Sequence, residues 1–336
     1  MTSRDAPAQK SSRRAAIGAL LALASGAASA PRAARAEAYP TRLIRFIVGF
    51  PPGGGTDVLA RLVGEGLTER LGVSIVVDNK GGASGTIGTA LGAKSKPDGY
   101  TLILGSSGAI LTAPSLYPAL PYDPRADFDP IGTLGSYPNI LYVPGASSIR
   151  TLAELIALAK ARQGALSYGS AGVGSTLHLS AVLLQQLSGI DIVNVPYTSG
   201  SMLQADLAEG RIDFSFASSA LAQLAKAGRI RAIASTGRKR SPSFPDVPTV
   251  AEQGFADYEV VNWFSLLAPR GTPADIVQTL NTALNQALAR GQMRERLTND
   301  LDFTVRTSTP AEVRAFIVEE QDRWARIIKS AQIQLD

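Results

Sequence analysis

The residues best suited to chemistry in this chain lie in short loops rich in glycine and hydroxyl side chains. The first loop reads FPPGGGTD (residues 50–57), and it follows an apolar run and precedes a helical pattern. Glycine lets the backbone approach a ligand closely, and a helix start offers unpaired N–H groups at the positive end of its dipole. The loop is therefore typical of a site for an anion such as a carboxylate. Asp57 could instead cap the helix, or hold water or a ligand ammonium group.

A matching loop occurs later in the chain, again between an apolar run and a helical pattern. It reads YGSAGVGSTLHL (residues 168–179), and Ser170, Ser175 and Thr176 offer hydroxyl groups. Any one such loop is more often an ordinary turn with a helix cap. Five of them at predicted strand ends favour a binding site, and two that suit anions suggest a ligand with two polar ends. The other three are NKGGASGT (79–86), GSSG (105–108) and VPYTSGS (195–201).

The motifs of several enzyme classes are absent. The chain has no G-x-G-x-x-G, no G-x-x-x-x-G-K-[ST] and no G-x-S-x-G. It has no cysteine and a single histidine, His178, which excludes disulfides, a cysteine nucleophile and a His-rich metal site. We therefore expect no cofactor and no metal, while paired carboxylates stay open because Asp and Glu occur throughout. His178 is predicted to orient its loop through Ser175 or Thr176.

The elements that position these loops alternate between strand-length apolar runs and helical patterns. Such alternation predicts an α/β fold with sheets covered by helices. Two similar series of this kind indicate two lobes, each a mostly parallel sheet flanked by helices. A proline-rich stretch, residues 114–130, is predicted to be a long surface connection. The predicted strands are 42–50, 73–78, 101–105, 139–144, 166–169, 190–195, 212–216, 230–235 and 258–269, and the predicted helices are 57–71, 85–94, 151–162, 175–188, 201–209, 218–227, 273–289 and 311–331.

The predicted domain organisation is that of a two-lobed, Venus-flytrap protein. Residues 39–140 plus 260–336 form a discontinuous first lobe, and residues 141–259 form the second. The chain crosses between them near 139–144 and 258–264, which predicts a hinge. Sites in such folds lie at the carboxyl ends of strands.

The first 36 residues have the pattern of a secretory leader. Arg13 and Arg14 precede a small-residue apolar run that is shorter than the ~20 residues of a membrane span. Cleavage is expected after Ala36 or Ala38, and both Sec and twin-arginine export stay open. This segment holds six of the 33 Lys and Arg residues and one of the 28 acidic residues, which leaves 27 of each. A neutral mature chain has no electrostatic footprint for nucleic acid or anionic lipid.

Nearly the whole mature sequence resembles a known family. YPTRLIRFIVGFPPGGGTDVLARLV, VVDNKGGASGTIGT, KPDGYTLILGSSG, LPYDPRADFDPIG, LSYGSAGVGSTLHLSAVLL and APRGTPADIVQTLN are each present, and the combination is highly specific. The chain resembles the Bug proteins, the periplasmic solute receptors of tripartite tricarboxylate transporters. The resemblance implies a periplasmic, monomeric, non-enzymatic receptor that closes on a small organic acid and passes it to membrane permease subunits.

The resemblance also implies which residues bind the ligand. Residues 50–57, 83–85 and Ser106 match first-lobe loops that hold a carboxylate, partly through ordered waters. Residues 170–178, with Tyr197, match the loops that meet the rest of the ligand. The predicted ligand-binding residues are Phe50, Gly54, Gly55, Thr56, Asp57, Ala83, Ser84, Gly85, Ser106, Ser170, Ala171, Ser175, Thr176, His178, Tyr197 and Thr198.

The sequence departs from the family pattern at two places. Thr198 and Ser199 follow Tyr197 where the family often has a basic residue, and Ser84 adds a hydroxyl. These changes favour a ligand that is less negatively charged than citrate. Two alternatives remain: an exported carboxylate-sensing component that docks on a membrane sensor, and an exported hydrolase or isomerase that uses Asp57 or another carboxylate.

Overall fold

The computed structural model describes residues 1–3 and 39–333. The predicted cleavage points, and the leader beyond its first three residues, lie outside the described residues. From Arg42 onward the chain forms one compact unit, and that unit is described below. None of its described helices combines the length and the apolar character needed to cross a membrane.

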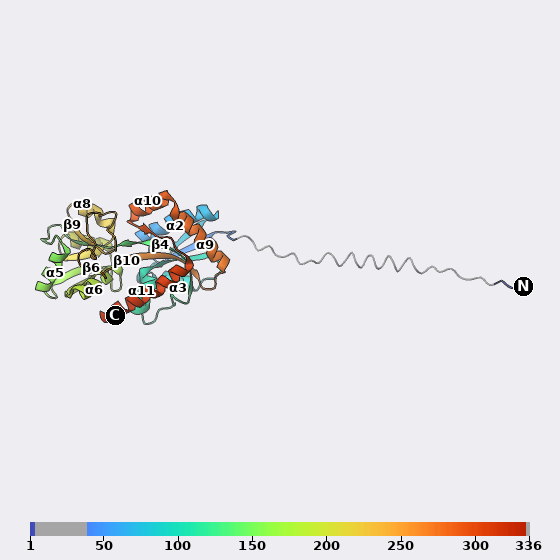
Figure 1. Cartoon of the computed structure of the whole chain (residues 1–336), viewed down its shortest axis with the longest axis horizontal. Helices are drawn as coiled ribbons and strands as arrows, with labels where there is room; N and C mark the ends of the chain where they lie inside the picture. The colour runs from blue at the N-terminus through green and yellow to red at the C-terminus, as the bar shows by residue number, and fades with distance from the viewer. Residues whose placement is uncertain (4–38, 334–336) are drawn as a thin grey trace. The chain divides into compact units, whose positions relative to one another are not determined.

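The first of two sheets has six strands in the order β11-β4-β10-β3-β1-β2. Its core strand β1 is almost completely buried, with Ile44, Phe46 and Val48 fully enclosed. Helix α2, from the N-terminal part of the chain, packs on β1 and β2, and helix α9, from the C-terminal part, packs on β4 and on α2 (Figure 1). The strands are β1 (Ile44–Val48), β2 (Ile75–Asn79), β3 (Thr101–Ser106), β4 (Phe128–Pro138), β10 (Val261–Pro269) and β11 (Thr304–Val305), and the helical segments are α2 (Gly55–Leu71), η1 (Ala83–Gly85), α3 (Thr86–Ala93), η2 (Ser107–Thr112), α4 (Ala113–Leu116), α9 (Ala274–Ala289), α10 (Gly291–Leu301) and α11 (Pro310–Ser330).

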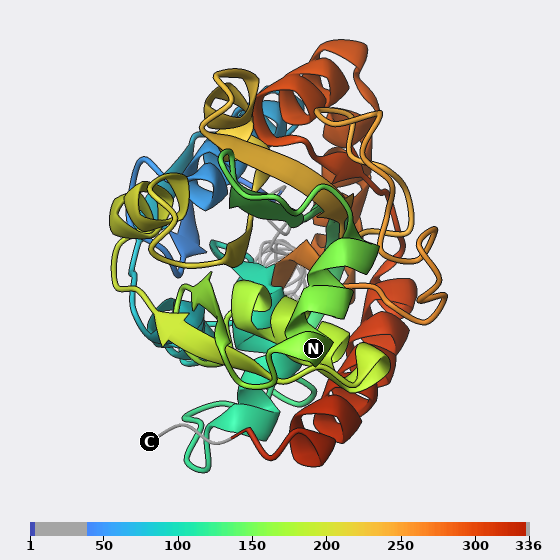
Figure 2. The same ribbon diagram turned by 90° about the vertical axis from the view of Figure 1, so that its left-hand side faces the viewer.

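The second sheet has five strands in the order β7-β6-β8-β5-β9. Figure 2 views the molecule from this side, with the elements of the second sheet in green to yellow and α11 in red beside them. The Gln186 side chain of α6 donates a hydrogen bond to the Ile327 carbonyl of α11, which joins the two groups of elements there. The elements are β5 (Ile140–Pro144), α5 (Leu152–Ala161), β6 (Leu166–Ser170), α6 (Thr176–Ser188), β7 (Ile192–Pro196), α7 (Gly200–Ala208), β8 (Phe214–Ala217), η3 (Ser219–Leu221), α8 (Ala222–Lys226) and β9 (Ile230–Ser235).

The two-lobed α/β class is confirmed, but the sheets are mixed rather than mostly parallel. The pairs β1–β2, β1–β3, β6–β7 and β6–β8 are parallel. The strands β10 and β5, which bring the chain from one sheet into the other, run against their neighbours. Because each enters its sheet from the edge at which the other strands end, its direction is reversed.

The stretch predicted as a long surface connection ends in β4, the longest strand among the described residues. Its sequence, FDPIGTLGSYP, contains proline and glycine, which normally indicate a loop. The structure accommodates them at two register shifts against β10, on either side of Gly132, and at Gly135, where φ is 143°. The short helix α10 is a second element absent from the prediction. Its sequence is mostly polar, and it buries only Met293 and Leu297.

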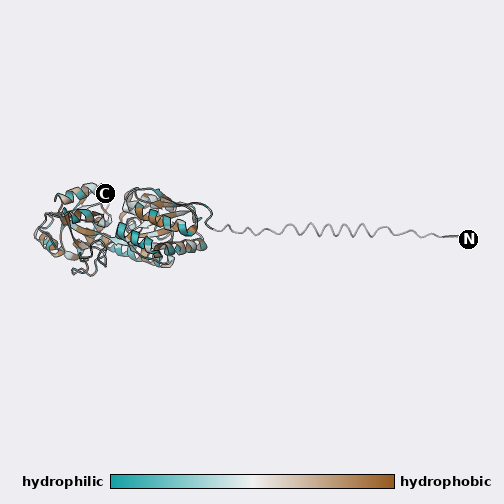
Figure 3. Cartoon of the chain, turned by 90° about the horizontal axis from the view of Figure 1, so that it is seen from above, coloured by the Kyte–Doolittle hydropathy of each residue, from teal (hydrophilic) through white to brown (hydrophobic). Residues whose placement is uncertain are grey.

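Helix α2 buries an apolar face. In α2 the buried side chains include Leu59, Leu62, Val63 and Leu67, and a left-handed Gly72 with φ of 72° ends the helix. Figure 3 shows the same division across the fold, with brown apolar strands enclosed by helices that carry teal residues outward. The packed helices hold the two sheets in place, and the loops at the strand ends are available to form a binding site.

Candidate ligand-binding site

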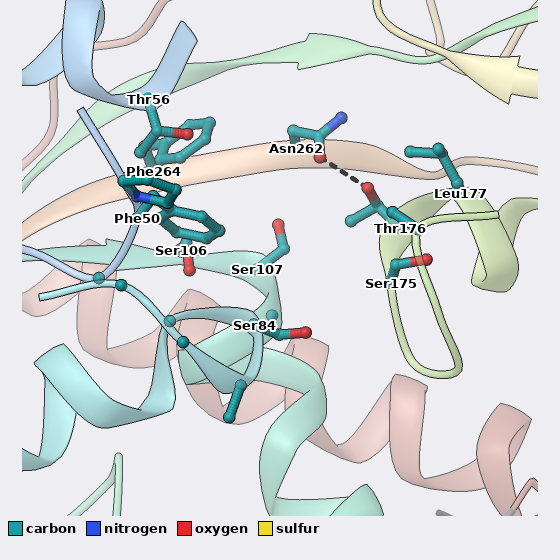
Figure 4. A pocket seen from close by; sticks show the side chains of 18 of the residues that line it. Phe50, Thr56, Ser84, Ser106, Ser107, Ser175, Thr176, Leu177, Asn262 and Phe264 are labelled. Atoms are coloured by element: carbon teal, nitrogen blue, oxygen red, sulfur yellow. Dashed lines mark hydrogen bonds between the residues drawn. The ribbon is translucent and has the colours of Figure 1, made fainter. Parts of the chain in front are cut away.

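The loops at the carboxyl ends of the strands enclose a cavity of about 850 Å³, which we call the site cavity. That volume lies within the range of small-molecule sites. Residues from both sheets line it, as Figure 4 shows for Ser84 and Ser106 on one side and Thr176 on the other. The lining residues are Gly49, Phe50, Pro51, Pro52, Thr56, Asn79, Gly81, Gly82, Ala83, Ser84, Gly85, Ser106, Ser107, Gly108, Tyr137, Ala171, Ser175, Thr176, Leu177, Thr198, Asn262 and Phe264.

The loop after β1 reaches the cavity because glycine allows its backbone to touch the loop after β2. A Cβ atom on Gly49 would lie 2.6 Å from the Gly85 carbonyl oxygen, and one on Gly88 would lie 2.8 Å from the Gly49 Cα. No side chain fits at such separations. The close approach sets Phe50 against Gly85, where a Cβ would meet the Phe50 ring at 3.2 Å.

The loop after β2 holds two consecutive non-glycine residues in the left-handed region. Ala83 has a φ of 46° and Ser84 a φ of 54°. Each such residue costs about 1–2 kcal/mol, and strain of this kind is concentrated at functional sites. The conformation places the Ser84 hydroxyl in the cavity (Figure 4). Gly85, with φ of 93°, then starts α3.

The loop after β3 contributes two serines with different tasks. The Ser106 hydroxyl accepts a hydrogen bond from the Ala109 N–H at 3.4 Å and so starts the π-helical turn η2. The Ser107 hydroxyl accepts from the Trp263 N–H at 2.8 Å and donates to the Val261 carbonyl at 3.1 Å. Ser107 therefore attaches this loop to β10.

On the side of the second sheet, the start of α6 faces the cavity. Ser175 caps the helix, because its hydroxyl accepts from the His178 N–H and donates to the Gly172 carbonyl at 2.7 Å. The Thr176 hydroxyl donates to Asn262 Oδ1 at 2.7 Å, the dashed line of Figure 4. Asn262 Nδ2 in turn donates to Asn139 Oδ1 at 2.9 Å. The α6 start is thus tied to the strands that connect the sheets.

No Asp, Glu, Lys, Arg or His side chain of the described chain lines the cavity. Its polar groups are hydroxyls, amides and the starts of α2, α3 and α6, whose first N–H groups have no partner within the helix. A carboxylate gains ~0.3–2 kcal/mol from a helix dipole and ~1.5–3 kcal/mol from each charge-assisted hydrogen bond. The arrangement can therefore hold an anion without a cationic side chain.

Ten of the residues predicted from the sequence line this cavity and six do not. Gly54 caps α2 and Gly55 is its first residue, next to Thr56, which does line the cavity. Ser170 is fully buried, and its hydroxyl accepts from the Gly172 N–H. Tyr197 lines an adjoining cavity of about 230 Å³ and donates to Asp206 at 2.8 Å. The ten are Phe50, Thr56, Ala83, Ser84, Gly85, Ser106, Ala171, Ser175, Thr176 and Thr198.

Asp57 is a buried carboxylate whose oxygens are occupied by protein donors. Oδ2 accepts from the Gly53 N–H and from Arg61 Nε, each at 2.9 Å, and Oδ1 accepts from Asn79 Nδ2 at 3.0 Å. Burial acts to raise the pKa of Asp57, but these hydrogen bonds and the Arg61 charge outweigh it and lower the pKa. The ionised Asp57 carboxylate therefore holds the loop after β1 in place. Asp57 does not line the cavity.

His178 is also directed at its own loop. Its Nδ1 accepts a hydrogen bond from the Gly174 N–H at 3.2 Å, so the imidazole orients the loop through Gly174 rather than through Ser175 or Thr176 as predicted. Burial lowers the pKa of His178 to about 4. The ring is therefore neutral at physiological pH and keeps Nδ1 free to accept.

Several lining residues were not predicted. Asn79 and Ser107 lie within loops recognised in the sequence, and only the choice of residue differs. Tyr137 belongs to β4, which the sequence did not reveal. Asn262 and Phe264 alternate with Trp263 on β10, so recognising the crossing strand as a cavity wall would have found them.

Comparisons with known proteins identify the family of the chain. The family described as "Tripartite tricarboxylate transporter family receptor" matches residues 59–333. The chain is similar to Rpa4515 of R. palustris, solved with adipate, at 37% identity and a TM-score of 0.80 over 88% of this chain and 100% of that one.

Two further solved structures are similar to the chain. The periplasmic binding protein BugD is 33% identical with a TM-score of 0.77, over 88% of this chain and 100% of that one. MatC of Rhodopseudomonas palustris, solved with bound malate, is 34% identical with a TM-score of 0.75, over 86% and 100%. The chain therefore belongs to the family of tripartite tricarboxylate transporter receptors.

Proposed function

We propose that this chain is a periplasmic receptor that captures a small dicarboxylate in the site cavity and delivers it, unaltered, to the membrane subunits of a tripartite transporter. The observation that carries the proposal is an uncharged cavity surrounded by helix starts and hydroxyls from both sheets. Such a cavity can bind carboxylates at two ends. Similar proteins are known with adipate and with malate.

The proposal includes closure about a hinge. Residues 39–140 plus 260–336 would move as one lobe and residues 141–259 as the other. Support comes from the hydrogen-bonded segments between the sheets, where the Thr236 N–H donates to the Asn139 carbonyl and the Val260 N–H donates to the Thr236 carbonyl. A ligand that contacts both lobes stabilises the closed form and shifts the population toward it.

Titration calorimetry of the mature protein with adipate, malate and citrate tests the proposal. We expect the dicarboxylates to bind more tightly than citrate, because the cavity offers no cationic side chain for a third carboxylate. Small-angle scattering should show compaction with the same ligands, and NMR should recover them unchanged. Absence of both binding and compaction, or turnover of the bound acid, would contradict a receptor.

A further inference from the structure

A second cavity, of about 380 Å³, lies across β4 and β10 from the site cavity; we call it the rear cavity. Side chains alternate between the two faces of a strand. On β10, Asn262 lines the site cavity and Trp263 lines the rear cavity. On β4, Tyr137 lines the site cavity, whereas Ser136 and Pro138 line the rear one. The two strands that connect the sheets are therefore a wall shared by both cavities.

The rear cavity is unlike the site cavity in charge, because five cationic and two acidic side chains line it. Three of the cations have carboxylate partners, in the pairs Arg238–Glu259, Arg240–Glu252 and Arg323–Glu320. Lys239 and Arg306 have exposed side chains and form no ion pair within residues 39–333. The positive charge of Arg306 helps to lower the pKa of Glu312, whose carboxylate accepts a hydrogen bond from the Thr309 N–H.

Aromatic side chains also line the rear cavity. The rings of Trp263 and Phe316 have centroids 5.1 Å apart. Trp324 also lines the cavity, and the Arg323 guanidinium lies over its ring at 5.3 Å from the centroid. The lining of the rear cavity thus combines aromatic side chains with two positive charges that have no ion-pair partner among the described residues. These are Lys239 in the loop after β9 and Arg306 in the segment after β11.

We propose that the rear cavity binds a small organic anion. Its carboxylate lies between Lys239 and Arg306, and its apolar part contacts Trp263 and Phe316. The volume is within the range of small-ligand sites, and the charge of the lining selects against neutral and cationic molecules. This second site is separate from the proposed function, because binding in the rear cavity does not require a ligand in the site cavity.

The chain supplies its own reporter for this site, because both of its tryptophans, Trp263 and Trp324, line the rear cavity. The experiment titrates benzoate into the mature protein at constant ionic strength and records tryptophan fluorescence. We expect a saturable change with benzoate and none with benzamide, which has the same shape without the charge. The double variant Lys239→Ala/Arg306→Ala should weaken benzoate binding at least tenfold.

The matched control is Lys94→Ala/Lys226→Ala, which removes two exposed lysines that line neither cavity. It should bind benzoate as the unmodified protein does, and circular dichroism should show both double variants folded. A linear, unsaturable response would overturn the proposal. So would equal responses to benzoate and benzamide, or unchanged benzoate affinity in Lys239→Ala/Arg306→Ala.

Discussion

The Thr176 hydroxyl and Asn262 Oδ1 are joined by a 2.7 Å hydrogen bond that links the start of α6 to β10. Asn262 Nδ2 also donates a hydrogen bond to Asn139, the residue that precedes β5 of the second sheet. One pair of side chains therefore both lines the site cavity and fixes a helix of one sheet against a strand of the other. We therefore expect ligand contacts and the geometry of the crossing strands to be coupled at this point.

Thr176→Val tests that coupling, because valine has the shape of threonine but cannot donate. Loss of one hydrogen bond costs about 0.5–1.5 kcal/mol, so carboxylate affinity should fall by up to about tenfold in calorimetry. Thr176→Ser keeps the hydroxyl and should retain the original affinity. Equal affinities for the valine and serine variants would show that the bond has no part in binding.

Asp57→Asn should destabilise the fold, and it should abolish no enzymatic turnover. The substitution removes a charge that accepts from the Gly53 N–H, Arg61 and Asn79. We expect urea unfolding to show a loss of about 1.5–3 kcal/mol, the range for hydrogen bonds to charged groups. Asp275→Asn is the control, since Asp275 is an exposed acid in the first turn of α9. A stability equal to that of the control would refute the anchoring role.

Gly49→Ala should disturb the site without any effect from positive φ. The new Cβ would lie 2.6 Å from the Gly85 carbonyl oxygen, so the two loops must separate. Overpacking of this kind costs about 1–3 kcal/mol, and ligand affinity should fall with it. Gly291→Ala, where a Cβ meets nothing within 4 Å, should be close to neutral in the same urea and calorimetry measurements. A Gly49→Ala variant with normal affinity would mean that the close contact is unimportant.

Thr198→Arg should change ligand preference toward more highly charged acids. Thr198 lines a cavity that has no charged side chain among the described residues, so an arginine there would supply its first positive charge. We expect citrate affinity to rise relative to malate, and to fall more steeply with salt than before. Thr198→Gln supplies length without charge and should leave the preference unchanged. The same shift in the glutamine variant would refute an electrostatic cause.

His178 should make stability depend on pH in the mildly acidic range. Its pKa is lowered by burial to about 4, against about 6.5 in the unfolded chain. Its contribution to stability is therefore complete above pH 6.5 and is lost as the pH falls through 4. Urea unfolding between pH 7 and pH 4 should show this loss, and His178→Asn should flatten it. Because the chain has no other histidine, parallel profiles for the two proteins would contradict the assignment.

The sequence was most informative where local pattern and tertiary structure agree. Apolar periodicity predicted α2 and glycine-rich loops predicted the cavity wall at Ser84 and Ser106. The sequence-based prediction failed at β4, because Pro130 and the glycines of this stretch are typical of a loop. In the structure they lie within a strand because the pairing with β10 shifts register beside them. Asn262 was missed for a related reason. Its alternation with Trp263 on β10 places it on the cavity side, but its hydrogen bonds to the distant Thr176 and Asn139 cannot be read from local spacing.

The glycine contacts between the loops after β1 and β2 also bear on how such proteins diversify. Gly49 and Gly88 cannot acquire side chains without separating the backbones that they bring together. Ser84 and Thr198 are under no such steric limit from a backbone contact, and their side chains enter the cavity. Substitutions at those two positions can therefore change the ligand specificity while the backbone contacts between the loops stay the same.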